Sequence, residues 1–323
     1  MKALAVFSGG LDSMLAAKLI MAQDIDVLGL FFETPFFSSA KARKSAATID
    51  LPLETIDLTK PHLEVVKNPK HGYGVNMNPC IDCHALMLRK AGDMLQEEGA
   101  SFIITGEVLG QRPMSQNKKA LFIVAAQSGY QGLILRPLSA KQLPMTVPEE
   151  EGWIRRDELM GFSGRSRKPQ MELAKKFNII EYPSPAGGCL LTDQLFSRRL
   201  KDLLSLQSDP ELREIELLKL GRHFRIGPHT KLVVGRNKRE NEAILSLSRD
   251  TDLILKIVSV PGPVALLVGD FSPQTEELAT SITVSYSDAK DDEPTEVRLL
   301  RQGLEKHLMA SPHDKKGFRV YMI

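Results

Sequence analysis

The sequence predicts a doubly wound α/β fold, a parallel sheet with helices on both faces, followed by a smaller α+β domain. Between residues 3 and 139, apolar runs typical of buried strands alternate with helical patterns. Further along the chain, helical segments come first and several strand patterns follow one another. A chain of 323 residues also suits two domains. We therefore expect one domain over residues 1–195 and a second over residues 196–323.

In the first domain, strand and helix patterns follow each other in a regular order. Strands are expected at residues 3–8, 26–33, 51–58, 101–107 and 133–139, and helices at residues 12–23, 37–50, 83–100 and 118–129. A proline-rich segment over residues 138–188 holds one further helix, at residues 168–178. Ligands of such folds bind beyond the carboxyl ends of the strands. The stretches "SGGLDS" (8–13) and "TGEVLGQ" (105–111) both follow strands, so we expect them to share one crevice.

The second domain is expected to begin with helices and to continue mainly with strands. The predicted helices cover residues 196–206 and 209–221, and the predicted strands cover residues 230–237, 252–260, 262–270 and 281–288. A final helix over residues 293–308 and a short strand over residues 317–323 complete the expected order.

Composition is that of an ordinary soluble globular protein. Hydrophobic residues make up 42% and charged residues 25%, and the net charge of +2 is too small to indicate nucleic acid by itself. The N-terminus lacks the pattern of a signal peptide, and no apolar run is long enough to span a membrane. We therefore expect a cytoplasmic protein without a membrane partner. The three cysteines form an odd number, which argues against a disulfide framework.

The stretch "SGGLDS" has the features of a phosphate site. Gly9 and Gly10 allow a sharp turn and a close approach of an anion, and a helix is expected to begin directly afterwards. Ser8 and Ser13 add hydroxyl donors, and Asp12 adds a carboxylate suited to Mg²⁺. The pattern is neither a Walker A loop nor the dinucleotide fingerprint. The alternative is a plain strand-to-helix turn with a polar cap.

This stretch resembles the PP-loop of the N-type ATP pyrophosphatases, S-G-G-x-D-S. Members of that family cleave ATP between the α and β phosphates and adenylate a substrate oxygen. The resemblance implies that Ser8, Gly9, Gly10 and Ser13 hold pyrophosphate oxygens, and that Asp12 coordinates Mg²⁺ or positions the reacting groups.

The segment "TGEVLGQRP" would complete the nucleotide pocket that this resemblance implies. Gly106 and Glu107 are then expected to line the pocket. Gln111 and Arg112 are placed to reach phosphate or tRNA, although an arginine there also reads as solvated surface.

The cysteines Cys80, Cys83 and Cys189 leave three kinds of site open. "CIDC" fits a redox pair at the start of a helix. It also fits half of a zinc site, for which Cys189 and either His71 or His84 would complete four ligands. The third possibility is a [4Fe-4S] cluster on three thiolates, in which one iron keeps an open position for a ligand such as sulfide. Gly187 and Gly188 would allow Cys189 to approach such a cluster.

PP-loop proteins with a CxxC and a distant cysteine resemble the tRNA thiouridine synthases. "TGEVLGQRPMSQ" (105–116) is similar to a segment of ThiI, and "NPCIDC" with the later cysteine is similar to MnmA and to the archaeal-type TtuA. Some members use two catalytic cysteines and a persulfide, and others use a three-cysteine [4Fe-4S] cluster. The three-cysteine pattern favours the cluster, with Cys80, Cys83 and Cys189 as its metal-binding and catalytic cysteines.

The resemblance implies an ATP-dependent tRNA sulfurtransferase. Adenylation converts a uridine carbonyl oxygen into a good leaving group, Mg²⁺ neutralises the departing pyrophosphate, and a sulfide displaces AMP. The implied partners are tRNA and a sulfur donor, either sulfide or a sulfur carrier, and a homodimer is possible.

A second resemblance concerns the later part of the chain. "TKLVVGRNKRENEAIL" (230–245) is similar to the NFACT-R module of ribosome-associated quality-control factors, which implies RNA contact by Arg236, Lys238 and Arg239. The alternative is a strand and turn that only pack. Four basic clusters are further candidates for phosphate contact, at residues 41–44, 155–156, 164–168 and 235–239.

Two other functions fit the same motifs. One is a PP-loop ATP pyrophosphatase that acts on a small substrate. The other is a zinc-stabilised RNA-binding adaptor whose ATP site is vestigial.

Overall fold

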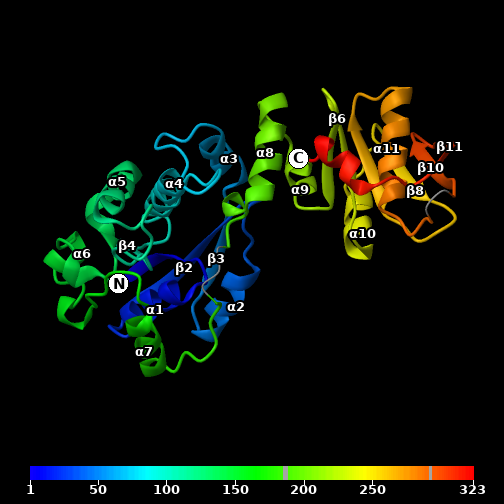
Figure 1. Ribbon diagram of the computed structural model, residues 1–323. Coiled ribbons are helices and arrows are strands. Elements are labelled where there is room, and N and C mark those ends of the chain that lie inside the picture. Colours follow the sequence, from blue (N-terminus) through cyan, green and yellow to red (C-terminus); the bar gives the residue numbers. More distant parts are fainter. Residues whose placement is uncertain (185–187, 291–292) are drawn as a thin grey trace. The chain divides into compact units, whose positions relative to one another are not determined.

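The computed structural model describes residues 1–184, 188–290 and 293–323. Contacts divide the chain into two units, residues 1–192 and residues 193–323, shown in Figure 1. The division lies close to the expected boundary after residue 195. Each unit has its own sheet and its own apolar core.

The first unit is built on a parallel sheet of five strands, which confirms the predicted doubly wound α/β fold. The strands lie in the order β3-β2-β1-β4-β5, and all neighbouring pairs are parallel. Their bounds are β1 Lys2–Val6, β2 Asp26–Glu33, β3 Leu53–Asp57, β4 Phe102–Thr105 and β5 Ile134–Leu135. The chain leaves β1 towards β2 and β3 and returns to β4 on the other side of β1. This reversal is the topological switch point at which such folds bind ligands.

Helices cover both faces of this sheet because side chains of each strand point alternately to the two sides. Ala3 and Ala5 of β1 belong to one core, and Leu4 between them belongs to the other. The first core includes residues of α1 Leu11–Met21, α2 Ala40–Thr48 and α7 Lys168–Lys176, and the second includes residues of α4 Cys80–Asp93 and α5 Lys118–Ser128. In Figure 1, α4 and α5 accordingly lie on one side of the sheet, and α1 and α7 lie on the other.

Shorter helices connect these elements. They are α3 Thr59–Lys67 and α6 Val147–Glu150, together with the 3-10 turns η1 Gln131–Leu133, η2 Ala140–Gln142, η3 Arg156–Glu158 and η4 Leu190–Thr192. Helix α3, which separates β3 from α4, was not predicted from the sequence.

The second unit is an antiparallel sheet of six strands with helices, so the predicted α+β class is confirmed. The strand order is β11-β10-β8-β9-β7-β6. The strands are β6 Arg222–Gly227, β7 Thr230–Val234, β8 Leu253–Ile257, β9 Val264–Gly269, β10 Thr295–Arg301 and β11 Leu304–Ala310, and the helices are α8 Gln194–Leu206, α9 Leu212–Leu217, α10 Lys238–Ser246 and α11 Pro273–Ser285. Neither β6 nor α10 was predicted.

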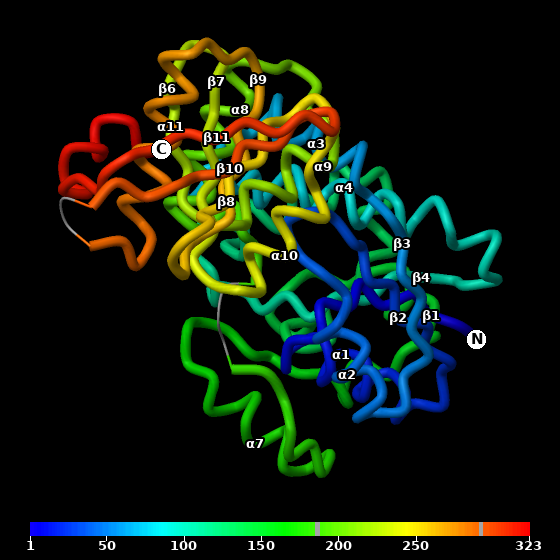
Figure 2. Tube along the Cα trace, turned by 90° about the vertical axis from the view of Figure 1, so that its right-hand side faces the viewer, coloured from blue at the N-terminus to red at the C-terminus, as the bar shows by residue number. Residues whose placement is uncertain are grey.

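The predicted helix over residues 293–308 is wrong, because this segment forms the hairpin of β10 and β11 seen side by side in Figure 2. Thr295, Val297 and Leu299 are buried, and the residues between them are more exposed, which is the two-residue period of a strand. Gln302 and Gly303 have φ angles of 49° and 75°, which suit a tight hairpin turn.

Two more expectations at this end of the chain are wrong. Residues 281–288 were predicted as a strand but belong mainly to α11, whose first turn is fixed by a capping box between Ser272 and Thr275 and by Pro273. Residues 317–323 were also predicted as a strand, but the chain forms a 3-10 helix, η5 Lys315–Tyr321. In α11, the start signal at residues 272–275 therefore outweighs the strand preference of the β-branched residues Ile282, Thr283 and Val284.

None of the helices in the described parts of the chain combines the length and the apolar character that crossing a bilayer requires.

A close approach of two backbones fixes the turn between β1 and α1. Gly9 has a φ angle of +75°, and a Cβ atom placed there would lie 2.6 Å from the Cα and 2.9 Å from the N of Ala42 in α2. Both neighbours are backbone atoms, so they cannot swing away as a flexible side chain would. Only glycine fits this position.

We expect Gly9→Ala to destabilise the protein more than Gly129→Ala, measured as the free energy of unfolding in urea. Gly129 has a φ angle of +85°, but no described heavy atom lies within 4 Å of its Cβ position. Both substitutions carry the left-handed backbone cost of about 1–2 kcal/mol. Gly9→Ala adds an overpacking cost of about 1–3 kcal/mol. Equal losses of stability would show that α2 does not constrain the turn.

Candidate functional site

The turn over Ser8–Gly10 has uncapped helical N–H groups next to it. Helix α1 begins at Leu11 with Gly10 as its N-cap, and among the described residues no side chain caps it. Ser13 Oγ donates to the carbonyl of Gly10 at 2.8 Å and lies 3.3 Å from Ser8 Oγ. The two hydroxyls therefore lie together at a helix N-terminus, an arrangement that suits an anion.

The structure brings the two predicted motifs together at the switch point. Strands β1 and β4 pair in parallel, with Val6 opposite Thr105. Gly106 packs so tightly against α1 that a Cβ there would lie 2.5 Å from the backbone N of Ser13. Gln111 Nε2 donates to Asp12 Oδ2 at 2.8 Å. Residues 8–13 and 106–111 therefore meet at the carboxyl ends of β1 and β4, where the crevice is expected.

Asp12 keeps one carboxylate oxygen free. Its Oδ1 is buried and has no hydrogen-bond partner within the part of the chain that the structure describes. A buried acceptor without a partner is costly unless a ligand satisfies it. A carboxylate oxygen of this kind fits the Mg²⁺ that accompanies a bound nucleotide.

Glu107 is the centre of a buried ion network. Its two oxygens accept from Arg136 Nε and from His84 Nδ1, each at 2.9 Å. Burial raises the pKa of Glu107, but the charge of Arg136 and the hydrogen bond with His84 outweigh it, and the pKa falls to about 2. Glu107 is therefore an ionised anchor of the loop after β4, with both oxygens already bound.

The three cysteines act on one another electrostatically, although Cys189 is far from the others in the chain. Cys80 opens α4, Cys83 follows one turn later, and Cys189 directly precedes η4. Leu190 N donates to the carbonyl of Phe36 at 3.1 Å, which ties this segment to the chain after β2. Of the two glycines expected to help, Gly187 lies outside the described residues, and the Cβ position of Gly188 meets no described atom within 4 Å.

The pKa values of the thiols reflect their burial and their interaction. Burial, followed by the charges of Cys189 and Cys80, raises the pKa of Cys83 well above its ordinary value. Burial raises the pKa of Cys189 to about 11. Burial also raises the pKa of Cys80, and the nearby charge of Arg112 opposes that rise. All three thiols are therefore protonated at neutral pH, and metal binding to them would release their protons.

The donor set differs from that of a closed zinc site. In the described residues, no three His, Cys, Asp or Glu side chains gather closely enough to hold one ion. Both histidines considered as fourth ligands have other partners, because His71 Nδ1 lies 2.9 Å from Asp82 Oδ1 and His84 is bound to Glu107. In a cluster, each cysteine binds a different iron and the thiolates need not converge on one point. One buried and two half-buried thiols that act on one another electrostatically do not conflict with that arrangement.

His62 contacts one of the three cysteines and was not predicted from the sequence. It lies on α3, is fully buried, and places Nε2 3.1 Å from Cys83 Sγ. The ring centroids of Phe36 and Phe37 lie 5.5 Å and 5.6 Å from the centroid of the His62 ring. Burial lowers the pKa of His62 to about 4, so the ring is neutral at physiological pH. No local sequence motif marks His62, because its partner Cys83 lies on another helix, 21 residues further along the chain.

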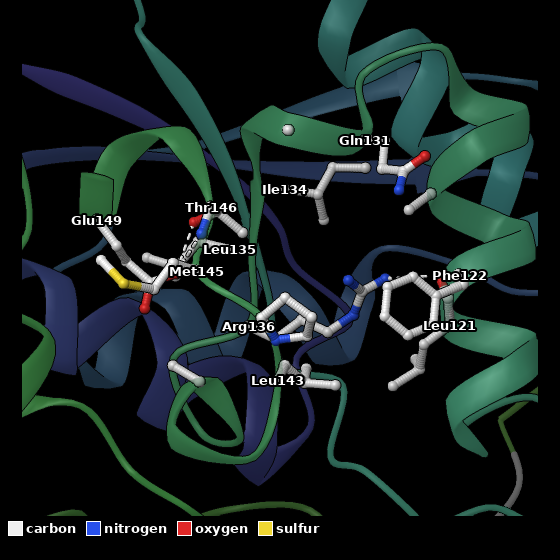
Figure 3. A pocket seen from close by; sticks show the side chains of 14 residues that line it. Leu121, Phe122, Gln131, Ile134, Leu135, Arg136, Leu143, Met145, Thr146 and Glu149 are labelled. Atoms are coloured by element: carbon white, nitrogen blue, oxygen red, sulfur yellow. Dashed lines mark hydrogen bonds between the residues drawn. The ribbon is translucent and has the colours of Figure 1, made fainter. Parts of the chain in front are cut away.

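A cavity of about 140 Å³ lies beside the site and not within it. Figure 3 shows its wall, made mainly by apolar side chains of α5, β5 and residues 143–149, with Arg136 between them. Glu149 accepts hydrogen bonds from the backbone N and the Oγ1 of Thr146, the N-cap of α6, and forms an ion pair with Arg156. The cavity includes neither the glycine turn nor a cysteine, so it is not part of the crevice.

Comparison with known families confirms both resemblances predicted from the motifs. Residues 1–142 match the family described as "Thiamine biosynthesis protein (ThiI)". Residues 221–322 match the family described as "NFACT protein RNA binding domain". The first match includes the glycine turn, the loop after β4 and the CxxC pair. Cys189 lies between the two matched segments.

Individual relatives point the same way. "tRNA-specific 2-thiouridylase MnmA 2" of Thermoanaerobacter sp. is 27% identical over 298 residues, which cover 85% of this chain and 76% of the relative. "Probable tRNA sulfurtransferase" of Methanosarcina mazei is 30% identical over 118 residues, which cover 34% of this chain and 29% of the relative. Among solved structures, a 4-thiouridine synthetase in complex with RNA and ATP aligns with 55% of this chain and 51% of its own, at 21% identity and a TM-score of 0.35.

We expect Glu107→Gln to destabilise the protein by about 3–5 kcal/mol at pH 7, because the buried charge of Arg136 loses its partner. The pKa of Glu107 is about 2 in the folded protein against an ordinary 4.5. Its contribution to stability is therefore complete above pH 4.5 and is lost as the pH falls towards 2. Urea unfolding at several pH values should show the gap between wild type and variant closing over that interval.

Glu98→Gln is the control for this comparison. Glu98 pairs with Lys2 at 2.7 Å, and the two side chains are 23% and 30% exposed. Removing such a pair should cost no more than about 1 kcal/mol. A gap for Glu107→Gln that stays constant from pH 7 to pH 3 would contradict the assigned ion network.

Proposed function

We propose that the protein is an ATP-dependent tRNA sulfurtransferase, which adenylates a uridine carbonyl oxygen of tRNA and replaces that oxygen with sulfur. The relatives' printed names and the match of residues 1–142 support this proposal. The observation that carries it is the loop after β4. Gln111 binds Asp12 of the glycine turn, and the next residue, Arg112, acts electrostatically on Cys80. Two consecutive residues thus connect the glycine turn, where ATP is proposed to bind, with Cys80, where the sulfur chemistry is proposed to take place.

On the nucleotide side, each residue has a distinct task in the proposal. Ser8, Ser13 and the N–H groups at the start of α1 hold the pyrophosphate part of ATP. Asp12 Oδ1 holds Mg²⁺, and Gly9 and Gly10 let the phosphates approach the backbone. With the phosphates fixed, the uridine oxygen attacks the α-phosphate, pyrophosphate leaves, and the oxygen becomes part of a good leaving group.

On the cysteine side, Cys80, Cys83 and Cys189 are proposed to hold a [4Fe-4S] cluster. Such a cluster, bound by three cysteines, offers one iron to an external ligand such as sulfide. The chain's own contribution is the full burial of Cys83, the partial burial of Cys80 and Cys189, and the positive charge of Arg112 near Cys80. AMP leaves with the original uridine oxygen once sulfur has bonded to the activated carbon.

Contact with RNA is proposed for the second unit. Lys238 at the start of α10 is 91% exposed, and its Nζ lies 4.0 Å from Glu242 Oε1 in a solvated ion pair. Arg236 forms a closer ion pair with the more buried Glu240, so it is more fully neutralised. Arg239, which is exposed, and Lys238 therefore carry the larger share of a phosphate contact in this proposal.

Two variants should separate the two half-reactions when AMP and thiolated nucleosides are both measured with unmodified tRNA, ATP, Mg²⁺ and sulfide. Asp12→Asn should lower AMP formation by about 100-fold or more, because the activating step loses its charge. Cys189→Ser should retain tRNA-dependent AMP release but form no thiolated nucleoside. The exposed Glu97→Gln, the same kind of substitution, should behave as wild type. AMP release that is independent of tRNA would favour the small-substrate alternative.

Protein purified without oxygen should contain about four iron atoms and about four acid-labile sulfides per chain. Cys80→Ser, Cys83→Ser and Cys189→Ser should each lower both contents, with a loss of visible absorbance. Colourless protein with one zinc per chain would favour the RNA-binding adaptor instead.

A further inference from the structure

A second glutamine stands behind the contact between Gln111 and Asp12. Gln170 lies on α7, and its side chain is completely buried. Gln170 Nε2 donates to Gln111 Oε1 at 3.1 Å, and Gln111 Nε2 donates to Asp12 Oδ2 at 2.8 Å. The three side chains thus form one hydrogen-bonded relay from α7 to the first turn of α1.

The direction of this relay follows from the chemistry of its last member. An ionised carboxylate only accepts hydrogen bonds, so Gln111 has to turn its NH₂ group towards Asp12. The carbonyl end of Gln111 then faces the other way and needs a donor. Gln170 supplies that donor, and its own Oε1 is left buried without a partner among the described residues.

Packing alone does not account for a glutamine at this position. Leu173 and Ala174, three and four residues further along α7, are buried in the apolar core on this side of the sheet. An apolar side chain of similar volume would serve that core without leaving an unpaired oxygen. The hydrogen bond to Gln111 is what Gln170 adds.

We propose that Gln170 is a positioning residue for Asp12. It fixes the amide of Gln111, which then holds Asp12 Oδ2 and leaves Asp12 Oδ1 for the Mg²⁺·ATP of the proposed function, on which this inference rests. Without Gln170, the Gln111 amide is free to turn its carbonyl towards the carboxylate. Asp12 then loses its fixed orientation while keeping its charge.

The test is a double-variant cycle with binding as its readout. Dissociation constants of Mg²⁺ with a non-hydrolysable ATP analogue are measured by calorimetry, without tRNA, for wild type, Gln170→Met, Gln111→Met and the double variant. Removing a group that orients a metal ligand typically weakens binding at least about tenfold. Gln170→Met and Gln111→Met should each do so, and the double variant should be no weaker than Gln111→Met alone.

Leu173→Met is the matched control, because it changes the packing of the same helix without touching the relay. Its dissociation constant should stay within about twofold of that of wild type, as expected for a swap that conserves volume. Independent, multiplying effects of the two glutamine substitutions would overturn the proposal. So would a Gln170→Met protein that fails to fold, since Gln170 would then support the fold as a whole.

The outcomes separate this inference from the proposed function. A protein that binds the analogue and shows the predicted coupling, yet never thiolates tRNA, keeps the relay and loses the sulfurtransferase proposal. A wild-type protein that does not bind Mg²⁺·ATP overturns both.

Discussion

The site depends on two close backbone approaches at the switch point of the parallel sheet. Gly9 lies against the backbone of Ala42, and Gly106 lies against the backbone of Ser13. A side chain at residue 106 would push α1 away from the end of β4. A side chain at residue 9 would push the glycine turn away from α2. Because both contacts are tight, the first turn of α1 has one position relative to the end of β4. Asp12 and Ser13 are carried on that turn.

From this constraint it follows that the loop after β4 can serve two sites at once. Glu107 anchors it through a buried network with Arg136 and His84, so the loop leaves the sheet in a fixed direction. Gln111 then meets Asp12, and Arg112 acts on Cys80. The proposed activation of the substrate and the proposed delivery of sulfur thus share one rigid support, which suits two consecutive steps on the same uridine carbonyl.

Sequence reasoning succeeded where a pattern is local and failed where a partner is distant. The apolar runs of β1, β2 and β4 predict a parallel sheet because buried strands need them on both faces. His62 and Gln170 escaped notice because their partners lie 21 and 59 residues away in the chain. Residues 293–308 were misassigned because charged residues spread among apolar ones resemble an exposed helix, whereas burial alternates along β10.

The surroundings of the three cysteines favour neutral thiols over charged thiolates. Burial keeps Cys83 protonated, and a thiolate formed there would be repelled by Cys80, Cys189 and Asp82. A neutral His62 relieves none of that repulsion by charge, but a ring N–H can donate to the sulfur. In the proposed function, the compensating positive charge comes from the bound cluster, and Arg112 is the protein's own contribution near Cys80. The proposed cluster and the proposed Mg²⁺ would thus have the same task, because each would supply positive charge to protein groups that form no such contact in the described residues, the cysteines in one case and Asp12 Oδ1 in the other.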